Sequence, residues 1–261
     1  MTAPQRIVCL TEEPVETLYL LGQEHRIAGV TGYAVRHKRV RQEKPRVGAF
    51  TSADIPKILA LNPDLVLTFS DLQADIAAEL IRAGVEVMAF NQRNVAGILK
   101  MIRTLGRLVD CADKAEVLAQ GYEMRIADLR SQAPKTLPKV YFEEWDDPMI
   151  TSIGWVSDLI EIAGGTDCFA HLKVEQAAKD RIVTSDQVIA AQPDVIVASW
   201  CGKKVRPEKI AARPGWDQIP AVAQGRIIEI KSPLILQPGP AALSDGLDAL
   251  IAALSPEKVP A

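Results

Sequence analysis

Several aromatic, acidic and thiol side chains directly follow short apolar runs that resemble buried strands. These runs are rich in β-forming residues and alternate with segments of helical spacing, which predicts parallel sheets. Ligands of open parallel sheets bind beyond the carboxyl ends of the strands. The residues in such positions are Thr11, Glu12, Glu13, Tyr33, Phe69, Ser70, Asp71, Glu143, Glu144, Trp145, Asp146, Trp200, Cys201 and Gly202. We therefore expect the binding chemistry of this chain among them.

Aromatic side chains are prominent at these positions, although aromatic residues make up only 5% of the chain. Five of them could line a cleft and stack on a flat ligand: Tyr33, Phe69, Trp145, Trp155 and Trp200. The alternative is that the three tryptophans fill the packing between lobes. Both interpretations fit Trp155 equally, whereas the position of Trp200 just past a strand favours the cleft.

No combination of residues indicates catalysis. The three histidines, His25, His37 and His171, lack metal-ligand spacing, and the chain contains neither a G-x-S-x-G nor a G-x-G-x-x-G motif. The run EEWDDP at 143–148 could bind a cation through its carboxylates, or it could be a solvated acidic loop. We predict no catalytic residue, no resident metal and no cofactor.

The four cysteines lie far apart in the sequence without a C-x-x-C pair, which argues against zinc and redox motifs. Cys201 differs from the others because Trp200 precedes it and Lys203 and Lys204 follow it. Nearby cations lower the pKa of a thiol, so Cys201 could be a soft thiolate that faces a chelated transition metal. The alternative is an ordinary reduced cysteine.

The composition bounds the class of protein. The chain has 30 basic and 33 acidic residues and a net charge of -3, which gives no nucleic-acid footprint. No apolar run reaches the ~18 residues that a membrane span needs. Residues 34–47 hold six of the basic residues, as a solvated loop or as a patch for an anionic group. The start MTAPQRIVCL lacks a secretory pattern, so we expect a cytoplasmic protein unless a leader was removed.

One long amphipathic helix is predicted over 113–133. Its apolar stripe comprises Ala115, Leu118, Tyr122, Ile126, Leu129 and Ala133. We expect Asp113 to cap this helix with Glu116 as its partner, and Pro134 to end it.

The segments on either side of this helix are similar to each other. ILALNPDLVLTFS at 58–70 aligns with VIAAQPDVIVASW at 188–200 without a gap. The sequence therefore predicts an α/β protein of two Rossmann-like lobes with parallel central sheets, joined by one long α-helix, with a ligand cleft between the lobes. The expected boundaries are 1–111 for the first lobe, 112–134 for the linking helix and 135–261 for the second lobe.

The order of these segments resembles the helix-linked periplasmic substrate-binding proteins of ABC importers, and the vitamin B12-binding branch in particular. The matching pieces are RIVCLTEEPVETLYLLG, RIAGVTGY, GAFTSADIPKILALNPDLVLTF, GVEVMAF, DLIEIAGG, VIAAQPDVIVASW and QPGPAALSDGLDALIAAL. The resemblance implies a monomeric, periplasmic binding protein without catalysis, whose ligand is cobalamin or a similar metal chelate such as haem or a ferric siderophore.

Family members hold the ligand through aromatic residues, and Tyr33 and Phe69 fall where such residues occur. The resemblance also implies that one exposed carboxylate per lobe docks on an ABC permease. Asp75 or Glu79 in the first lobe and Glu208 in the second lie on the corresponding segments.

Two other functions remain open from the sequence. The first is a cytoplasmic enzyme or metallocofactor-handling protein on the same scaffold, with Cys201, Glu143, Glu144 and Lys203 as its polar site. The second is an interaction module without a small-molecule ligand. A mostly aromatic cleft would favour the binding protein, and a cleft of mixed charge would favour the enzyme.

Overall fold

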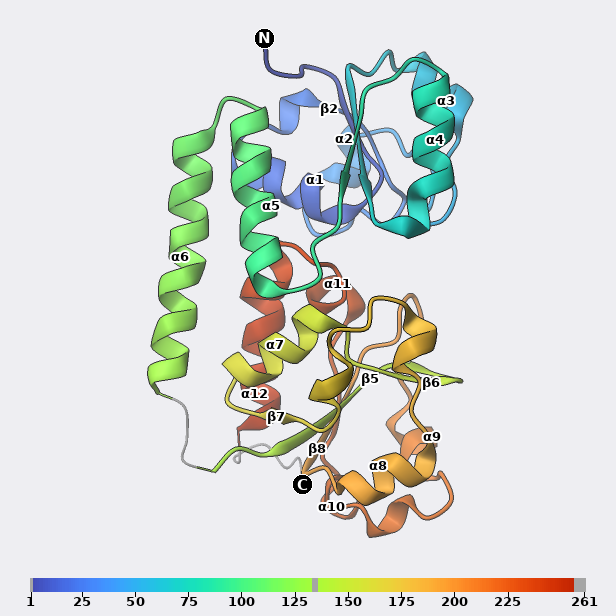
Figure 1. Cartoon of the computed structure of the whole chain (residues 1–261), viewed down its shortest axis with the longest axis vertical. Coiled ribbons are helices and arrows are strands. Elements are labelled where there is room, and N and C mark those ends of the chain that lie inside the picture. The colour runs from blue at the N-terminus through green and yellow to red at the C-terminus, as the bar shows by residue number, and fades with distance from the viewer. Residues whose placement is uncertain (1, 133–135, 256–261) are drawn as a thin grey trace. The chain divides into compact units, whose positions relative to one another are not determined.

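A computed structural model describes residues 2–132 and 136–255 of the chain. The chain folds into two compact units. Unit 1 comprises Met1–Gln92, Ala96–Gly121 and Gly239–Ala241, and unit 2 comprises Arg93–Val95, Tyr122–Pro238 and Ala242–Ala261. Each unit contains one β-sheet with helices on both of its faces (Figure 1).

The first part of the chain alternates strands with helices. Its elements are β1 (Ile7–Cys9), α1 (Glu12–Leu20), β2 (Ile27–Val30), α2 (Val40–Glu43), α3 (Ile55–Ala60), β3 (Leu65–Phe69), α4 (Ala74–Arg82), β4 (Val87–Phe90), α5 (Val95–Leu108) and α6 (Ala112–Ser131), with short 3-10 helices at Glu24–Arg26 and Asp71–Gln73. The strands form a parallel sheet in the order β2-β1-β3-β4.

Helices cover both faces of this sheet, which explains why β1 and β3 are continuous apolar runs rather than alternating ones. On one face, α3 and α4 pack on the strands through a buried apolar cluster that includes Val8, Ile58, Val66 and Leu80. Figure 1 shows α1 and α5 on the opposite face.

The second part of the chain repeats this alternation. Its elements are β5 (Lys139–Asp146), β6 (Met149–Thr151), α7 (Gly154–Ile162), β7 (Thr166–Asp167), α8 (Ser185–Ala191), β8 (Val195–Ala198), α9 (Pro207–Ala211), α10 (Pro220–Ala223), β9 (Ile227–Glu229), α11 (Ser232–Ile235), a π-helix (Ala242–Gly246) and α12 (Leu247–Leu254), with 3-10 helices at Ala170–Leu172, Ala178–Arg181 and Trp216–Gln218. The sheet order is β6-β5-β8-β9, and β7 also pairs with β5.

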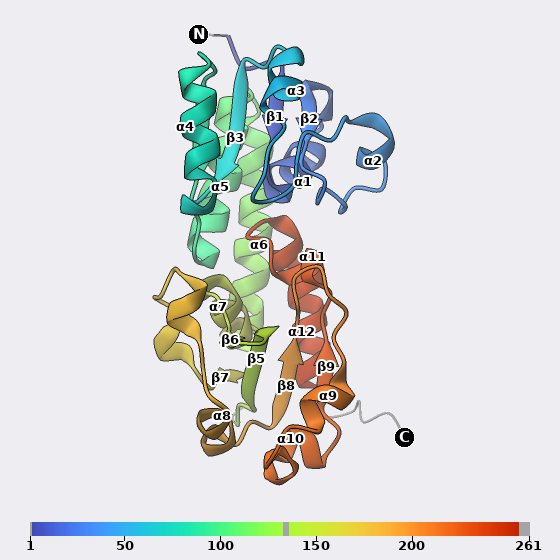
Figure 2. The ribbon, with the colours of Figure 1, turned by 90° about the vertical axis from the view of Figure 1, so that its right-hand side faces the viewer.

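The internal repeat is confirmed by the sheet topology. In unit 1, β1 lies between β2 and β3, and β4 follows β3. In unit 2, β5 pairs in parallel with β7 and β8, and β9 follows β8. The four parallel strands of each unit therefore connect in the same order, as Figure 2 shows for β5, β8 and β9.

The proline break in the repeat has the same geometry in both units. Asn62 and Gln192 adopt positive φ values of 46° and 48° directly before a proline. The aspartate after the proline, Asp64, accepts hydrogen bonds from the N–H groups of Gln5 and Arg6 at 2.6 and 3.0 Å.

In the second copy of this break, Asp194 accepts a hydrogen bond from Lys139 N–H at 2.8 Å. The Pro-Asp pair therefore links the start of β3 to the start of β1 in unit 1, and the start of β8 to the start of β5 in unit 2.

Two sequence expectations about element boundaries are wrong. Helix α6 begins at Ala112, so Asp113 lies inside its first turn, and the Glu116 carboxylate pairs with Arg103 at 2.8 Å instead of completing a cap. Strand β5 runs on to Asp146 and turns into the antiparallel β6, because Trp145 and Asp146 pair with Ile150 and Met149.

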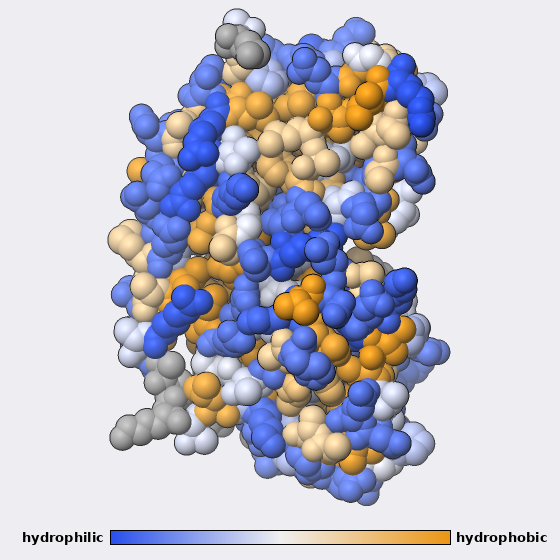
Figure 3. Space-filling model, in the orientation of Figure 1, coloured by the Kyte–Doolittle hydropathy of each residue, from blue (hydrophilic) through white to orange (hydrophobic). Residues whose placement is uncertain are grey.

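The apolar stripe of α6 is confirmed at Ala115 and Ile126, which are buried. Figure 3 shows hydrophilic side chains along most of the outer edge of α6, with separate apolar ones among them. Ala133 and Pro134 lie outside the described residues. Among the residues that the structure describes, no helix combines the length and the apolar character that a membrane span requires.

Candidate ligand-binding site

At the carboxyl end of β1 in unit 1, the structure buries two adjacent glutamates. The Glu12 carboxylate accepts hydrogen bonds from the backbone N–H groups of Val35 and, at 3.3 Å, Arg36. Burial raises the pKa of Glu12 to about 8, against the opposing effect of these two N–H groups. Glu12 therefore anchors the loop at residues 34–47 that is rich in basic residues. Its carboxylate oxygens already accept hydrogen bonds from this loop, which limits the ligand contact that we predicted for Glu12.

Its neighbour Glu13 is also buried, and its Oε1 atom has no hydrogen-bond partner among the described residues. Burial raises the pKa of Glu13 to about 7, while its own N–H and Thr11 act weakly in the opposite direction. The first turn of α1 thus holds two carboxyl groups that protonate close to neutral pH.

The two aromatic candidates of unit 1 differ in exposure. Tyr33 is 49% exposed and offers its ring to a ligand, whereas Phe69 is 4% exposed at the end of β3. Phe69 N–H also donates to the Gln73 side chain at 3.0 Å, which fixes the backbone at this strand end. Stacking on Tyr33 is therefore compatible with the structure as it stands, and stacking on Phe69 requires a rearrangement.

Trp155 occupies a packing position in unit 2. It lies at the start of α7 with 3% of its surface exposed, and its indole Nε1–H donates to Ile235 carbonyl oxygen at 2.9 Å. The polar edge of the indole is therefore satisfied inside unit 2, and Trp155 packs within this unit, whereas the packing interpretation placed it between the lobes.

The other two tryptophans of the predicted site lie together at the carboxyl ends of β5 and β8. The Lys203 ammonium group lies over both rings, 5.1 Å from the Trp145 centroid and 4.9 Å from the Trp200 centroid. It also forms an ion pair with Asp146 at 2.6 Å. The strand ends that the sequence nominated are therefore brought together in unit 2, with a lysine between the aromatic rings.

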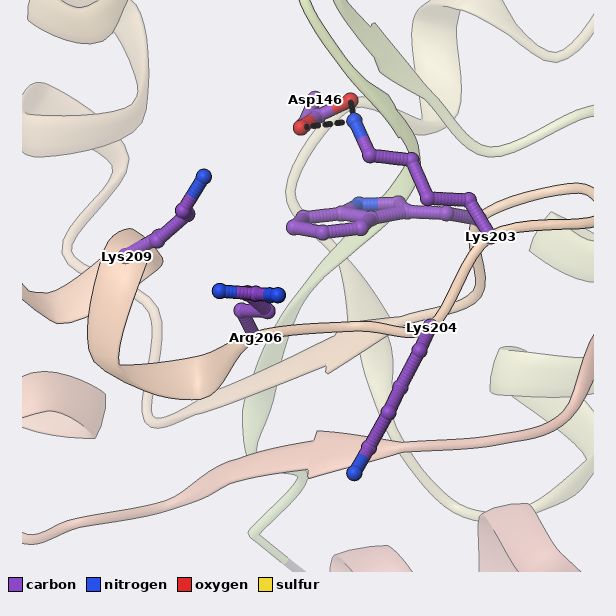
Figure 4. Close-up of a pocket in the computed structure, with 6 residues that line it drawn as sticks. Asp146, Lys203, Lys204, Arg206 and Lys209 are labelled. Atoms are coloured by element: carbon purple, nitrogen blue, oxygen red, sulfur yellow. Dashed lines mark hydrogen bonds and ion pairs between the residues drawn. The ribbon is translucent and has the colours of Figure 1, made fainter.

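A cavity of about 300 Å³ opens next to these residues. It is lined by Asp146, Trp200, Lys203, Lys204, Arg206 and Lys209. Figure 4 shows the Lys203 side chain turned toward Asp146, Arg206 and Lys209 beside each other, and Lys204 pointing away from them. Trp200 is 2% exposed, so a ligand can stack on its ring only if the half-exposed Lys203 side chain moves aside.

Trp200 is hydrogen-bonded to a buried ion pair between Glu143 and Arg213. Glu143 is fully buried, and its carboxylate accepts two hydrogen bonds from the Arg213 guanidinium at 2.5 and 3.0 Å. The same carboxylate accepts from the Trp200 indole at 3.1 Å and from the Tyr141 hydroxyl at 3.1 Å. A bidentate Arg–carboxylate pair with two further donors is a rigid arrangement, so Glu143 fixes the orientation of the indole.

Three carboxylates of the acidic run 143–148 are paired with cationic side chains of the chain itself. Glu144 pairs with the buried Arg181 at 2.5 Å, Asp146 pairs with Lys203, and Glu143 pairs with Arg213. Among the described residues, no group of three His, Cys, Asp or Glu side chains is arranged to hold a metal ion. Sequence reasoning missed this outcome because the cationic partners lie some 35 to 70 positions further along the chain.

The expectation for the Cys201 thiol is wrong in sign. Its pKa is raised by burial of the sulfur and by the nearby Glu144 carboxylate, not lowered by the lysines that follow it. Lys203 is neutralised by Asp146, which removes the cation that the sequence placed beside the thiol. A thiol with a raised pKa is a poor thiolate ligand at neutral pH.

Arg206 and Lys209 were not among the predicted site residues. Both belong to the stretch KKVRPEK that follows Trp200, and its density of basic residues was the available signal. Arg206 is the residue before α9 and Lys209 lies in its last turn, and both side chains line the same cavity. The proposed docking carboxylates Asp75, Glu79 and Glu208 are exposed.

Sequence comparison places this fold in a known group. The sequence pattern of the periplasmic binding protein family matches residues 7–234. This chain belongs to that family. The uncharacterised ABC transporter substrate-binding lipoprotein YvrC of Bacillus subtilis is 26% identical over 270 residues, which cover 97% of this chain and 81% of YvrC. A cobalamin-binding protein of Halobacterium salinarum is 25% identical over 247 residues, and the match covers 91% of this chain and 66% of that protein.

Solved structures of family members have the same fold. The periplasmic haem-binding protein RhuT from Roseiflexus, in apo form, matches with a TM-score of 0.81 and 25% identity over 96% of this chain and 99% of RhuT. The periplasmic vitamin B12-binding protein BtuF of Vibrio cholerae matches with a TM-score of 0.77 and 23% identity over 97% of this chain and 98% of BtuF. The predicted α/β fold with two parallel sheets is thereby confirmed.

Proposed function

We propose that this protein is the solute-binding component of an ABC importer and that its ligand is a metal chelate of the cobalamin, haem or ferric-siderophore kind. The observation that carries the proposal is the cavity over Trp200, at the carboxyl ends of β5 and β8, in a chain of the periplasmic binding protein family. Relatives named for cobalamin and haem binding support the ligand class. In this proposal, lobes 1–111 and 135–261 act on one ligand and residues 112–134 link them.

The residues of the enzymatic alternative do not favour catalysis. Glu143 is held by Arg213, Glu144 is held by Arg181, and Lys203 is held by Asp146. Burial raises the pKa of the Cys201 thiol. A general base or nucleophile needs a group that is free to exchange a proton near neutral pH, so we favour binding without chemistry.

Calorimetric titration tests the proposed function. Cyanocobalamin, aquocobalamin, haem and ferric siderophores are added separately to the purified protein. We expect one of these chelates to bind one-to-one with micromolar or tighter affinity and to raise the melting temperature by mass action. If no member of the panel binds, the proposed function is wrong.

Replacing Trp200 by alanine should weaken binding of that chelate by roughly 1 to 3 kcal/mol, because the ligand loses an aromatic surface next to the cavity. The melting temperature will also fall, since Trp200 is largely buried. Titration and thermal unfolding are therefore measured on the same preparation. A Trp200→Ala protein that is less stable but binds with unchanged affinity would place Trp200 in the core and move the site elsewhere.

We also propose that Glu208, with Asp75 or Glu79, docks on the permease. Glu208→Gln should leave ligand affinity unchanged within about twofold while lowering ligand-stimulated ATP hydrolysis by the reconstituted permease about fivefold or more, because docking charges act on association. Glu175→Gln removes an equally exposed carboxylate of unit 2 and serves as the control. Equal hydrolysis with both variants would remove Glu208 from the docking surface.

A further inference from the structure

The cavity over Trp200 carries a strong excess of positive charge. Its lining includes four cationic side chains and a single carboxylate, Asp146, which is already paired with Lys203 at 2.6 and 2.8 Å. Lys204 acts electrostatically on Glu229, but this carboxylate is itself paired with Lys231 at 2.7 Å. The lining therefore does not neutralise its own charge.

Arg206 and Lys209 contribute two of the positive charges that Asp146 does not neutralise. Within the part of the chain that the structure describes, neither side chain has a hydrogen bond or an ion pair. Figure 4 shows both side chains on the same side of the cavity, which Trp200 also lines. A planar guanidinium and an ammonium group at adjacent positions suit a ligand that offers two or more anionic oxygens.

A second cavity in unit 2 does not share this charge excess. That cavity also has a volume of about 300 Å³, and its lining combines cations with carboxylates. Its Lys173 is paired with Asp158 at 3.5 Å and with Glu161 at 3.2 Å. A cavity with balanced charges does not select the charge of a ligand, whereas a cavity lined by one sign of charge concentrates the opposite sign.

We propose that the cavity over Trp200 selects a metal chelate with net negative charge, and that Arg206 and Lys209 bind its carboxylate, phenolate or phosphate oxygens. This inference rests on the proposed function and narrows it: a neutral chelate leaves both cations without partners, whereas an anionic chelate satisfies them. The Lys203 ammonium group, released from Asp146 or shared with it, would contact the same anionic edge beside the indole.

The test compares an anionic iron chelate with a neutral one. Ferric enterobactin is a trianionic tris-catecholate, and ferrichrome is a neutral tris-hydroxamate with the same metal. Haem, which carries two propionates, and neutral cyanocobalamin form a second pair. We expect the anionic member of at least one pair to bind about tenfold or more tightly than the neutral one, and its affinity to fall at high salt.

Variants assign the selectivity to the two residues. Arg206→Gln and Lys209→Gln should each weaken binding of the anionic chelate about tenfold, and the double variant about a hundredfold, as expected for lost charge-assisted hydrogen bonds. Lys179→Gln removes an exposed lysine of unit 2 that does not line the cavity, and should change affinity less than about twofold. Circular dichroism melts check that every variant is folded.

The outcomes separate this inference from the proposed function. Tight binding of cyanocobalamin or ferrichrome with weak binding of both anionic chelates, or equal loss of both classes in the double variant, overturns the charge selectivity and leaves the importer role intact. Absence of binding by the whole panel overturns the importer role and the selectivity together.

Discussion

Replacing Glu143 by alanine is expected to lower the free energy of unfolding by about 3 to 5 kcal/mol, the usual cost of removing one partner from a buried ion pair. Glu143 is 0% exposed, so the substitution leaves the Arg213 guanidinium without its bidentate partner. The Trp200 indole and the Tyr141 hydroxyl lose their acceptor at the same time. Urea unfolding followed by circular dichroism measures the loss.

Two further variants separate charge from shape at this position. Glu143→Gln keeps an acceptor for the indole but removes the negative charge, and should cost less than alanine. Glu175→Ala, at an exposed position of the same unit, should change stability by less than about 0.5 kcal/mol. If Glu143→Ala is as mild as Glu175→Ala, the carboxylate does not support Trp200 as described.

The second large effect is a fall in stability with rising pH. Burial raises the pKa of Glu12 to about 8 and that of Glu13 to about 7, from an ordinary value of 4.5. The folded protein therefore binds protons more tightly than the unfolded chain. The stabilisation is fully present below pH 4.5 and is lost as the pH rises through about 7 and 8. At about 1.4 kcal/mol for each pKa unit between the ordinary and the raised values, we expect a total loss of up to about 8 kcal/mol over this window.

Glu13→Gln tests the origin of this pH dependence. The amide resembles the protonated carboxyl and cannot ionise, so the variant should be more stable than the parent above pH 8 by up to about 3 kcal/mol and should show a flatter profile. Glu86→Gln, at an exposed position of unit 1, should keep the parental profile. A Glu13→Gln protein with the full parental slope would contradict the role of this buried carboxyl group.

The fold was predictable because its signals are local. The apolar runs of β1, β3 and β8, the glycine and proline breaks and the repeat between 58–70 and 188–200 each depend on neighbouring residues. Parallel strands that are buried on both faces produce such continuous apolar runs. The cap of α6 failed because cap positions depend on one or two residues at a helix end, where sequence patterns are least informative.

The site was predictable only in part. Strand order correctly nominated Trp145, Trp200 and Asp146 for one end of the sheet in unit 2. Ion-pair partners could not be predicted, since Arg181, Arg213 and Lys203 meet the acidic run only after the chain has folded back on itself. These pairs occupy three carboxylates of the acidic run and the ammonium group of Lys203, so the lysine that follows Cys201 does not lower the pKa of its thiol.

The ligand contacts of Glu12, Tyr33 and Phe69 stay predictions, as do the cleft between lobes and the docking role of Asp75, Glu79 and Glu208. Of these three residues, Tyr33 is the first to test by mutation, because its ring is exposed, whereas Glu12 and Phe69 are buried. A Tyr33→Ala variant is therefore the natural companion to Trp200→Ala in the titrations.

Hydrogen exchange with mass spectrometry tests the location of the ligand most directly. Exchange is compared with and without saturating ferric enterobactin, and separately with and without haem, because bound ligand slows local opening of the segments that it contacts. We predict slower exchange in peptides that cover 199–213 and 141–147. Saturation by a chelate without any change in these peptides would contradict the assignment of the cavity over Trp200 as the binding site.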